Sequence, residues 1–267
     1  MKRLLATIGL LFTSIAFANP IHHLVFFGDS LSDNGNLYRF MDKTVPSPNY
    51  YYEGRFSNGI VWSEFLANHY FPTDTSNHVE NYAMGMASVS SDRTQESPLF
   101  ILDGQLETYF KNHPEGSSLE DSLFVFWIGS NNYLGIPDDD ADHTVTADVI
   151  AGINKNMELL VQKGAKNIVV LNLPDIGNTP FARSEDLYHD CPQTHKTCAS
   201  DALSDFSNRH NQSLYQSVFS SESGLKAKYP EVNWMFFNVN RMFVDVMQHP
   251  SYYGLTTVDE PCLKFDL

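Results

Sequence analysis

The 267-residue chain is poor in positive charge and in cysteine, and each shortage excludes a class of protein. It has 17 Lys and Arg against 32 Asp and Glu, a formal net charge of −15, and no basic run. Nucleic-acid-binding surfaces need clustered cations to neutralise phosphates, so we expect no nucleic-acid partner. Only three cysteines are present. The chain is therefore not a small domain held together by many disulfides.

Long apolar runs are absent after the first residues. Residues 4–17 are apolar, follow two cations at positions 2 and 3, and end at the small-residue pattern Ala16–Ala18. This arrangement is typical of a secretory signal peptide, so we expect residues 1–18 to be removed, with a buried N-terminal helix as the alternative. No other stretch reaches the ~18 apolar residues of a membrane span. We therefore expect no integral membrane segment and a secreted or periplasmic location.

Short apolar runs alternate with helical patterns in the rest of the chain. Continuous runs suit strands buried on both faces of a parallel sheet, and they occur at 24–27, 123–128, 168–171 and 234–237, with a weaker one at or just before 81–83. Apolar residues at helical spacing predict helices over 57–70, 144–163 and 201–221. This alternation predicts one α/β domain with a mostly parallel sheet.

The first run leads into the polar segment GDSLSDNGN at residues 28–36. Open α/β sheets bind and react at the carboxyl ends of their strands, which is where Ser30 stands. A serine hydroxyl there can attack an ester carbonyl, with backbone N–H groups nearby to stabilise the charge on the carbonyl oxygen. The segment differs from the G-x-S-x-G elbow because Ser32 replaces its last glycine. By these residues alone, Ser30 could equally be a helix cap.

Five segments, in the family's order, resemble the GDSL esterases of the SGNH hydrolase superfamily. They are GDSLSDNGN at 28–36, GRFSNG at 54–59, NYAMGMA at 81–87, GSNN at 129–132 and LPDIGNTP at 173–180. The branch resembled is that of exported bacterial lysophospholipases and glycerophospholipid:cholesterol acyltransferases. The resemblance implies a single-domain three-layer α/β/α sandwich with a mostly parallel, flavodoxin-like five-stranded sheet. It also implies a lipid or small ester substrate, a monomer, and neither a cofactor nor a metal.

The resemblance also assigns roles to individual residues. It implies that Ser30 is the nucleophile, and that Ser30, Gly85 and Asn131 form the oxyanion hole through two backbone N–H groups and the Asn131 side-chain amide. Met86 stands where the family's second block has another glycine, so the choice between the Gly85 and Met86 amides is open. Asn132 occupies the position of an acid in the third block. One oxyanion donor typically contributes ~3 kcal/mol to transition-state stabilisation.

A base for Ser30 is missing from the pattern. In the family, a histidine in a D-x-x-H pair near the C-terminus takes the proton and the aspartate orients it. Here Asp245 and His249 are one residue too far apart, and they precede a segment, 252–262, that comes before the D-x-x-H in relatives. We therefore expect residues 19–267 to be an SGNH-type hydrolase domain that lacks its C-terminal D-x-x-H segment.

Three hypotheses about function follow. The first is an exported hydrolase or acyltransferase for lipid or other carboxylic esters, of which this chain is a truncated form. The second is a shortened, catalytically weak paralogue that binds lipid or a protein partner. The third keeps catalysis and recruits His249, or another histidine, as the base. A D-x-x-H encoded shortly after Leu267 would support the first hypothesis.

The cysteines are expected to divide into a pair and a single residue. Cys191 and Cys198 are close in sequence, so an exported protein would join them in a short disulfide loop. A zinc site with His189 and His195 is the alternative. Cys262 is then left unpaired, and the resemblance implies that its partner lies in the same missing segment as the base.

Overall fold

The computed structural model describes residues 20–90, 96–114, 119–134, 144–184 and 199–263, and its sheet has five strands. The strands are β1 (His23–Gly28), β2 (Val79–Asn81), β3 (Ser122–Trp127), β4 (Asn167–Leu171) and β5 (Asn233–Phe237). The longer helices are α2 (Trp62–Tyr70), α4 (Leu102–Asn112), α6 (Thr144–Gln162), α8 (Ala199–Phe219) and α10 (Val239–Gln248). The short helices are α1 (Asn36–Phe40), α3 (Thr75–His78), α5 (Ser130–Tyr133), α7 (Pro180–Ser184) and α9 (Leu225–Lys228), with 3₁₀ turns η2 (Pro98–Phe100), η3 (Ile176–Asn178) and η4 (Pro250–Tyr253).

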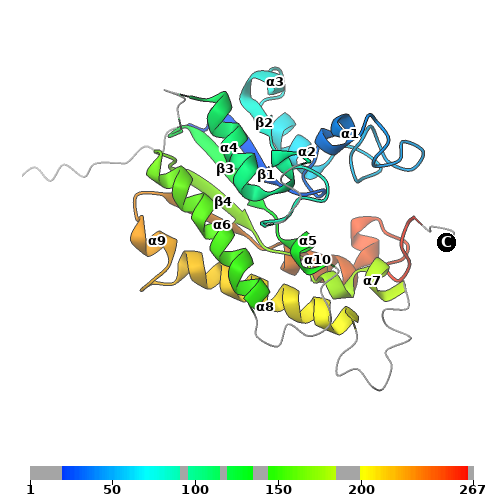
Figure 1. Cartoon of the computed structure of the whole chain (residues 1–267). Coiled ribbons are helices and arrows are strands. Elements are labelled where there is room, and N and C mark those ends of the chain that lie inside the picture. The colour runs from blue at the N-terminus through cyan, green and yellow to red at the C-terminus, as the bar shows by residue number, and fades with distance from the viewer. Residues whose placement is uncertain (1–19, 91–95, 115–118, 135–143, 185–198, 264–267) are drawn as a thin grey trace, which may run out of the picture.

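All neighbouring strands of the sheet are parallel, in the order β2-β1-β3-β4-β5 (Figure 1). This confirms the predicted flavodoxin-like sheet. The strand before Ser30, β1, lies between β2 and β3, and Gly28 at its end is level with Trp127 of β3. Parallel strands end at one edge of a sheet. The loops that follow β2, β1 and β3 therefore meet there.

Helices cover both faces of the sheet, which confirms the three-layer sandwich (Figure 1). Successive side chains of a strand point to opposite faces. In β1, Val25 and Phe27 pack in the core that α4, α6 and α8 share. Leu24 and Phe26 pack on the other face with residues of α2 and α10. This double burial explains why the strands are continuous apolar runs instead of alternating ones.

One predicted element needs correction. The helix expected over 57–70 begins at Trp62, because residues 57–61 belong to a loop and Glu64 caps the helix by accepting the Val61 N–H at 3.0 Å. The weak strand expected at or just before 81–83 is β2, which ends at Asn81. Helices α4 and α10 were not predicted. The other long elements lie within two residues of their predicted bounds.

Several expectations fall on residues that the structure does not describe. The predicted signal peptide, residues 1–18, and the predicted Cys191–Cys198 disulfide, with its zinc alternative, lie outside the described residues. Cys262 is described, and it is an exposed free cysteine. Within the described ranges, no helix is both long and apolar enough to span a membrane.

Candidate active site

Ser30 lies in a tight turn between β1 and α1 and not at the start of a helix, since α1 begins only at Asn36. The turn is closed by the N–H groups of Ser32 and Asp33, which donate to the Asp29 carbonyl oxygen at 3.1 and 3.0 Å. Asp29 and Ser32 are each 1 % exposed, whereas Ser30 is partly exposed. The turn therefore buries its neighbours and leaves Ser30 accessible at the edge of the sheet.

The end of β1 is fixed by Gly28 and by Gln105 of α4. A Cβ at position 28 would lie 2.5 Å from the Trp127 carbonyl oxygen, so only glycine fits. The fully buried Gln105 accepts the Gly28 N–H at 2.9 Å and donates to the Gly28 carbonyl at 2.8 Å. Buried amides of this kind need both partners, because an unmade hydrogen bond is costly there. Sequence analysis missed Gln105, since one glutamine in a helix forms no motif.

The Asp33 carboxylate fixes the backbone of the loop between β1 and α1. This buried carboxylate accepts the N–H groups of Gly35, Asn36 and Leu37 at 2.7, 2.5 and 3.0 Å. It also accepts the N–H of Gly85, from the loop after β2, at 2.7 Å. Burial raises the pKa of Asp33 above its ordinary value, and the four N–H groups act in the opposite direction. The Asp33-x-Gly35 spacing, typical of a side chain that hydrogen-bonds its own turn, was the available signal.

The second block lies beside this loop. The Gly85 N–H, which the sequence analysis assigned to the oxyanion hole, is directed to the Asp33 carboxylate. A Cβ on Gly85 would be 2.5 Å from the Phe56 ring, so the backbone approaches this ring closely. Met86 adopts the left-handed backbone, with φ of 67°, and its side chain is 48 % exposed. The amides of Gly85 and Met86 therefore differ in their surroundings.

The third block hydrogen-bonds directly to the segment that follows the second. Asn131, in α5, donates its side-chain N–H to the Ala87 carbonyl at 2.7 Å. Asn132, where the family has an acid, accepts the Val89 N–H at 2.9 Å. The predicted residues Ser30, Gly85 and Asn131 thus belong to three loops that follow three adjacent strands. Hydrogen bonds through Asp33 and Ala87 connect these loops in series.

His210 of α8 packs against Gly129 and Tyr133, which lie at the two ends of α5. It is fully buried, its Nδ1 is 2.9 Å from the Tyr133 hydroxyl, and its Cε1 would be 2.8 Å from a Cβ on Gly129. Gly129 also has φ of 125°, so it must be glycine for two reasons. Burial lowers the pKa of His210 to about 3, which keeps the ring neutral near pH 7. Its packing against Gly129 and Tyr133 gives it a structural role.

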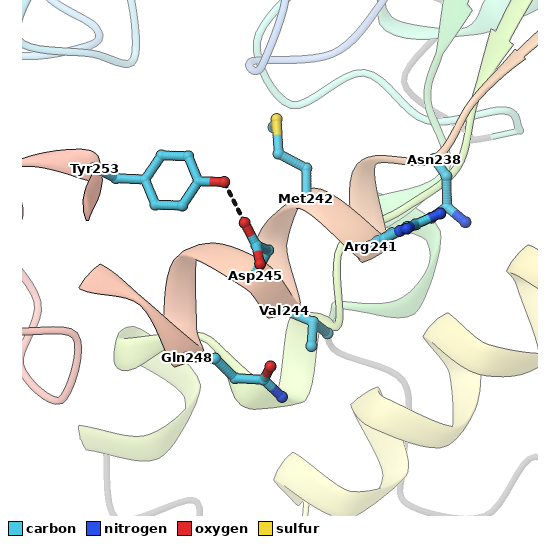
Figure 2. Close-up of a pocket in the computed structure, with 7 residues that line it drawn as sticks. All are labelled: Asn238, Arg241, Met242, Val244, Asp245, Gln248 and Tyr253. Carbon is cyan, nitrogen blue, oxygen red and sulfur yellow. Dashed lines mark hydrogen bonds between the residues drawn. The ribbon is translucent and has the colours of Figure 1, made fainter. Parts of the chain in front are cut away.

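His249 lies in an acid–histidine pair at the end of α10, the helix that follows the edge strand β5. Its Nδ1 is 3.2 Å from Asp245 Oδ1, and the Tyr253 hydroxyl donates to the other Asp245 oxygen. Figure 2 shows Tyr253 and Asp245 pointing toward one another beside a groove of about 530 Å³ along α10. The hydrogen bond from Tyr253 and the charge of His249 lower the pKa of Asp245.

This pair is not joined to Ser30. The helix α10 follows β5, which is separated from β1 by β3 and β4. The side chains of His249 and Asp245 are 62 % and 50 % exposed. Among the described residues, no histidine makes a hydrogen bond to Ser30. Those same ranges contain no cluster of three or more His, Cys, Asp or Glu placed to hold a metal ion.

Comparisons with known proteins show the family of the chain. The model of the family described as GDSL-like lipase/acylhydrolase matches residues 24–266. The chain is 30 % identical to a phosphatidylcholine-sterol acyltransferase of Aeromonas hydrophila over 90 % of its own length and 64 % of that protein. It is 29 % identical to the secreted effector protein SseJ of Salmonella typhimurium, covering 89 % of this chain and 52 % of the effector. For a thermolabile hemolysin of Vibrio parahaemolyticus, the identity is 24 %, over 93 % of this chain and 53 % of the hemolysin. The chain thus spans between about half and two thirds of the length of these relatives.

Proposed function

This chain belongs to the GDSL-like lipase/acylhydrolase family, and from that premise we propose that it is an exported serine hydrolase or acyltransferase acting on lipid or other carboxylic esters. By family it is of the carboxylic-ester hydrolase class. The apolar leader at residues 4–17 supports export, as does a relative that is named a secreted effector. The acyltransferase name of another relative supports a lipid ester as the substrate and an alcohol as a second acceptor.

One observation carries the proposal, namely the setting of Ser30. Its side chain is partly exposed on a turn whose backbone is fixed on both sides by buried groups, Gln105 before it and Asp33 after it. The loops after β2 and β3, which carry Gly85 and Asn131, flank this turn. A nucleophile that is held rigidly beside hydrogen-bond donors from two neighbouring loops is the arrangement that acyl transfer requires.

In the proposed reaction, Ser30 Oγ attacks the ester carbonyl carbon and its proton passes to a base. The negative charge on the carbonyl oxygen is met by the Ser30 N–H, by an N–H of the second block and by the Asn131 side chain, and the Gly85 N–H can be the second-block donor only if it leaves the Asp33 carboxylate. The contact with Ala87 uses one of the two Asn131 amide hydrogens and orients the other. The bond to the leaving alcohol then breaks, and water or a second alcohol releases the acyl group from Ser30.

The proposal is tested by turnover. We expect Ser30→Ala to lower hydrolysis of p-nitrophenyl butyrate at least about a hundredfold, because the acyl-enzyme can no longer form. Thermal unfolding should be unchanged, since no described residue makes a hydrogen bond with the partly exposed Ser30 hydroxyl. Lysophosphatidylcholine assayed in parallel distinguishes a lipid ester from a short-chain one. Equal turnover by the two proteins would refute a serine mechanism, and no turnover by either would fit a chain without its base as well as a binding protein.

The base is tested separately. We propose that the base comes from outside the described residues, because His249 pairs with Asp245 at a distance of two strands from the strand that leads to Ser30. His249→Ala is therefore expected to leave turnover within about twofold of the parent chain, measured with the same ester. A loss as large as that of Ser30→Ala would instead identify His249 as the base. His69→Ala, on α2, is the matched control for removing a histidine.

A further inference from the structure

Exposed apolar side chains gather on the edge of the sheet that carries Ser30. Of the 17 large apolar side chains that are exposed in the described ranges, 11 lie in loops, short helices and 3₁₀ turns outside the sheet and the long helices, and the other six are Phe237 at the end of β5 and Phe65, Tyr70, Tyr215, Met242 and Val244 on α2, α8 and α10. Figure 1 shows the loop around α1 and the segment around η4 on the same side of the molecule. Single exposed apolar residues need no explanation, but a set of them on one edge marks a contact surface.

The part of this edge nearest to the nucleophile is here called the apolar rim. It consists of residues 38 % to 61 % exposed, which are Leu31, Phe40, Met41, Tyr50, Tyr52 and Met86. Leu31 directly follows Ser30, and Met86 belongs to the second block. The apolar rim therefore starts at the nucleophile and extends outward along the loop that contains α1.

The loop that carries most of the apolar rim is held in its shape. The Arg55 guanidinium makes two hydrogen bonds to the Glu64 carboxylate, at 3.1 and 2.6 Å, and also lies 5.8 Å from the centre of the Tyr52 ring. The N–H of Lys43 donates to the Tyr38 carbonyl at 2.7 Å. The side chains of the rim are therefore displayed by a braced loop, and their exposure is a feature of the fold.

Backbone strain in the same loop points to a role for its shape. Asp42, Lys43 and Glu53 have left-handed φ angles of 50°, 63° and 43°. Such angles are unfavourable for any residue other than glycine. Strain of this kind persists where the surrounding structure imposes it, and it concentrates at functional sites.

The charge of residues 36–56, the loop that carries most of the apolar rim, indicates which kind of lipid surface the rim fits. The chain as a whole carries −15, but residues 36–56 contain three cations, Arg39, Lys43 and Arg55, and two anions, Asp42 and Glu53. The loop is therefore close to neutral on a strongly acidic protein. Three successive tyrosines, 50–52, add rings that are apolar with one polar tip, the type enriched where hydrocarbon meets water. A neutral, aromatic surface on an acidic protein fits a zwitterionic lipid surface better than an anionic one.

We propose that the apolar rim docks on a zwitterionic lipid surface, so that an ester reaches Ser30 from the lipid layer and not from free solution. The route of the ester rests on the function proposed above, whereas docking does not require turnover. Leu31 and Met86 lie at the inner end of the rim, beside the nucleophile loop. Phe40, Met41 and Tyr50 lie farther out, where they can enter the layer.

The test is flotation with phosphatidylcholine vesicles, using Ser30→Ala in every protein so that no ester is consumed. The chains begin at Asn19, which retains every described residue and removes the apolar run at 4–17. Adding Met41→Ser and Tyr50→Ser is expected to lower the partition coefficient about tenfold. Adding Phe65→Ser and Tyr215→Ser, at side chains that are 63 % and 51 % exposed on α2 and α8, should leave it unchanged. Binding should also be the same at about 50 and 500 mM salt, because it is not driven by charge.

Three outcomes would overturn the proposal: no flotation of the parent protein, equal partition of the two double variants, or binding only to anionic vesicles. Sedimentation velocity without lipid examines a protein partner. A dimer of the parent that dissociates on changing Met41 and Tyr50, without vesicle binding, would make the rim an interface between copies. If docking holds but Ser30→Ala has no effect on turnover in the separate assay, the ester chemistry fails and the lipid-binding surface remains.

Discussion

Replacing Asp33 with alanine is expected to lower the free energy of unfolding by at least about 4 kcal/mol. The change removes the acceptor of four backbone N–H groups, from Gly35, Asn36, Leu37 and Gly85. Hydrogen bonds to a charged group contribute about 1.5–3 kcal/mol each, and the buried N–H groups would be left unpaired. Because domains are stable by only about 5–15 kcal/mol, the variant should unfold at a far lower urea concentration.

The loss of stability should also depend on how much of the Asp33 carboxylate is removed. Asp33→Asn retains one acceptor oxygen and places an NH₂ group where two of the N–H donors point, so its loss should lie between those of the parent and the alanine variant. Asp148→Ala, on an exposed turn of α6, is the matched control and should change stability by less than about 0.5 kcal/mol. Stability of Asp33→Ala within about 1 kcal/mol of the parent would contradict this role. Turnover should fall in the same order, because Asp33 positions the loop that carries Ser30.

Asp29→Asn is expected to stabilise the protein at pH 8 by up to about 4 kcal/mol. Burial raises the pKa of Asp29 from its ordinary 3.8 to about 7, even though the Leu31 N–H donates to its carboxylate at 3.0 Å. The folded protein thus keeps a proton that the unfolded chain has already released at neutral pH. Asparagine has no charge to bury, and it retains an oxygen for the Leu31 N–H.

The sign of the pH dependence follows from the same shift. Below about pH 4 the carboxyl is protonated in both states, so its full contribution to stability is present. As pH rises toward 7, the folded state binds more protons than the unfolded state, and this contribution is progressively lost. The difference in unfolding free energy between Asp29→Asn and the parent should therefore grow from pH 4 to pH 7 and then level off. Parallel curves of unfolding free energy against pH for Asp29→Asn and the parent would contradict the shift.

Most of the strands could be read from the sequence. The four apolar runs lie within one residue of β1, β3, β4 and β5, because strands buried on both faces need no polar residues. Helix α4 was missed for a tertiary reason. Its apolar pattern is interrupted by Gly104 and Gln105, both buried. A Cβ on Gly104 would lie 2.1 Å from the Pro98 carbonyl oxygen of the preceding 3₁₀ turn, and Gln105 is hydrogen-bonded to the distant Gly28, so tertiary contacts and not helical periodicity dictate both positions.

The sequence predicted which residues belong to the candidate site, but it did not predict the hydrogen bonds between them. The motifs identified Ser30, Gly85 and Asn131, and the fold brings the three loops that carry them to adjacent strand ends. The motifs could not indicate that the Gly85 N–H binds Asp33, since this contact spans residues far apart in sequence. They also could not separate His249, which has an acid partner, from a histidine that serves Ser30.

The sequence by itself determined the α/β class and the family, and it predicted Ser30 as the nucleophile, because strand periodicity and short motifs are local properties of the chain. The tertiary structure decided the order of the strands, and therefore which loops flank Ser30. It also decided that Asp29 is buried and held near a pKa of 7, that Asp33 binds two loops together, and that the edge around Ser30 is apolar. Burial and hydrogen bonding between distant segments exist only after the sheet has formed, so no local pattern can encode them.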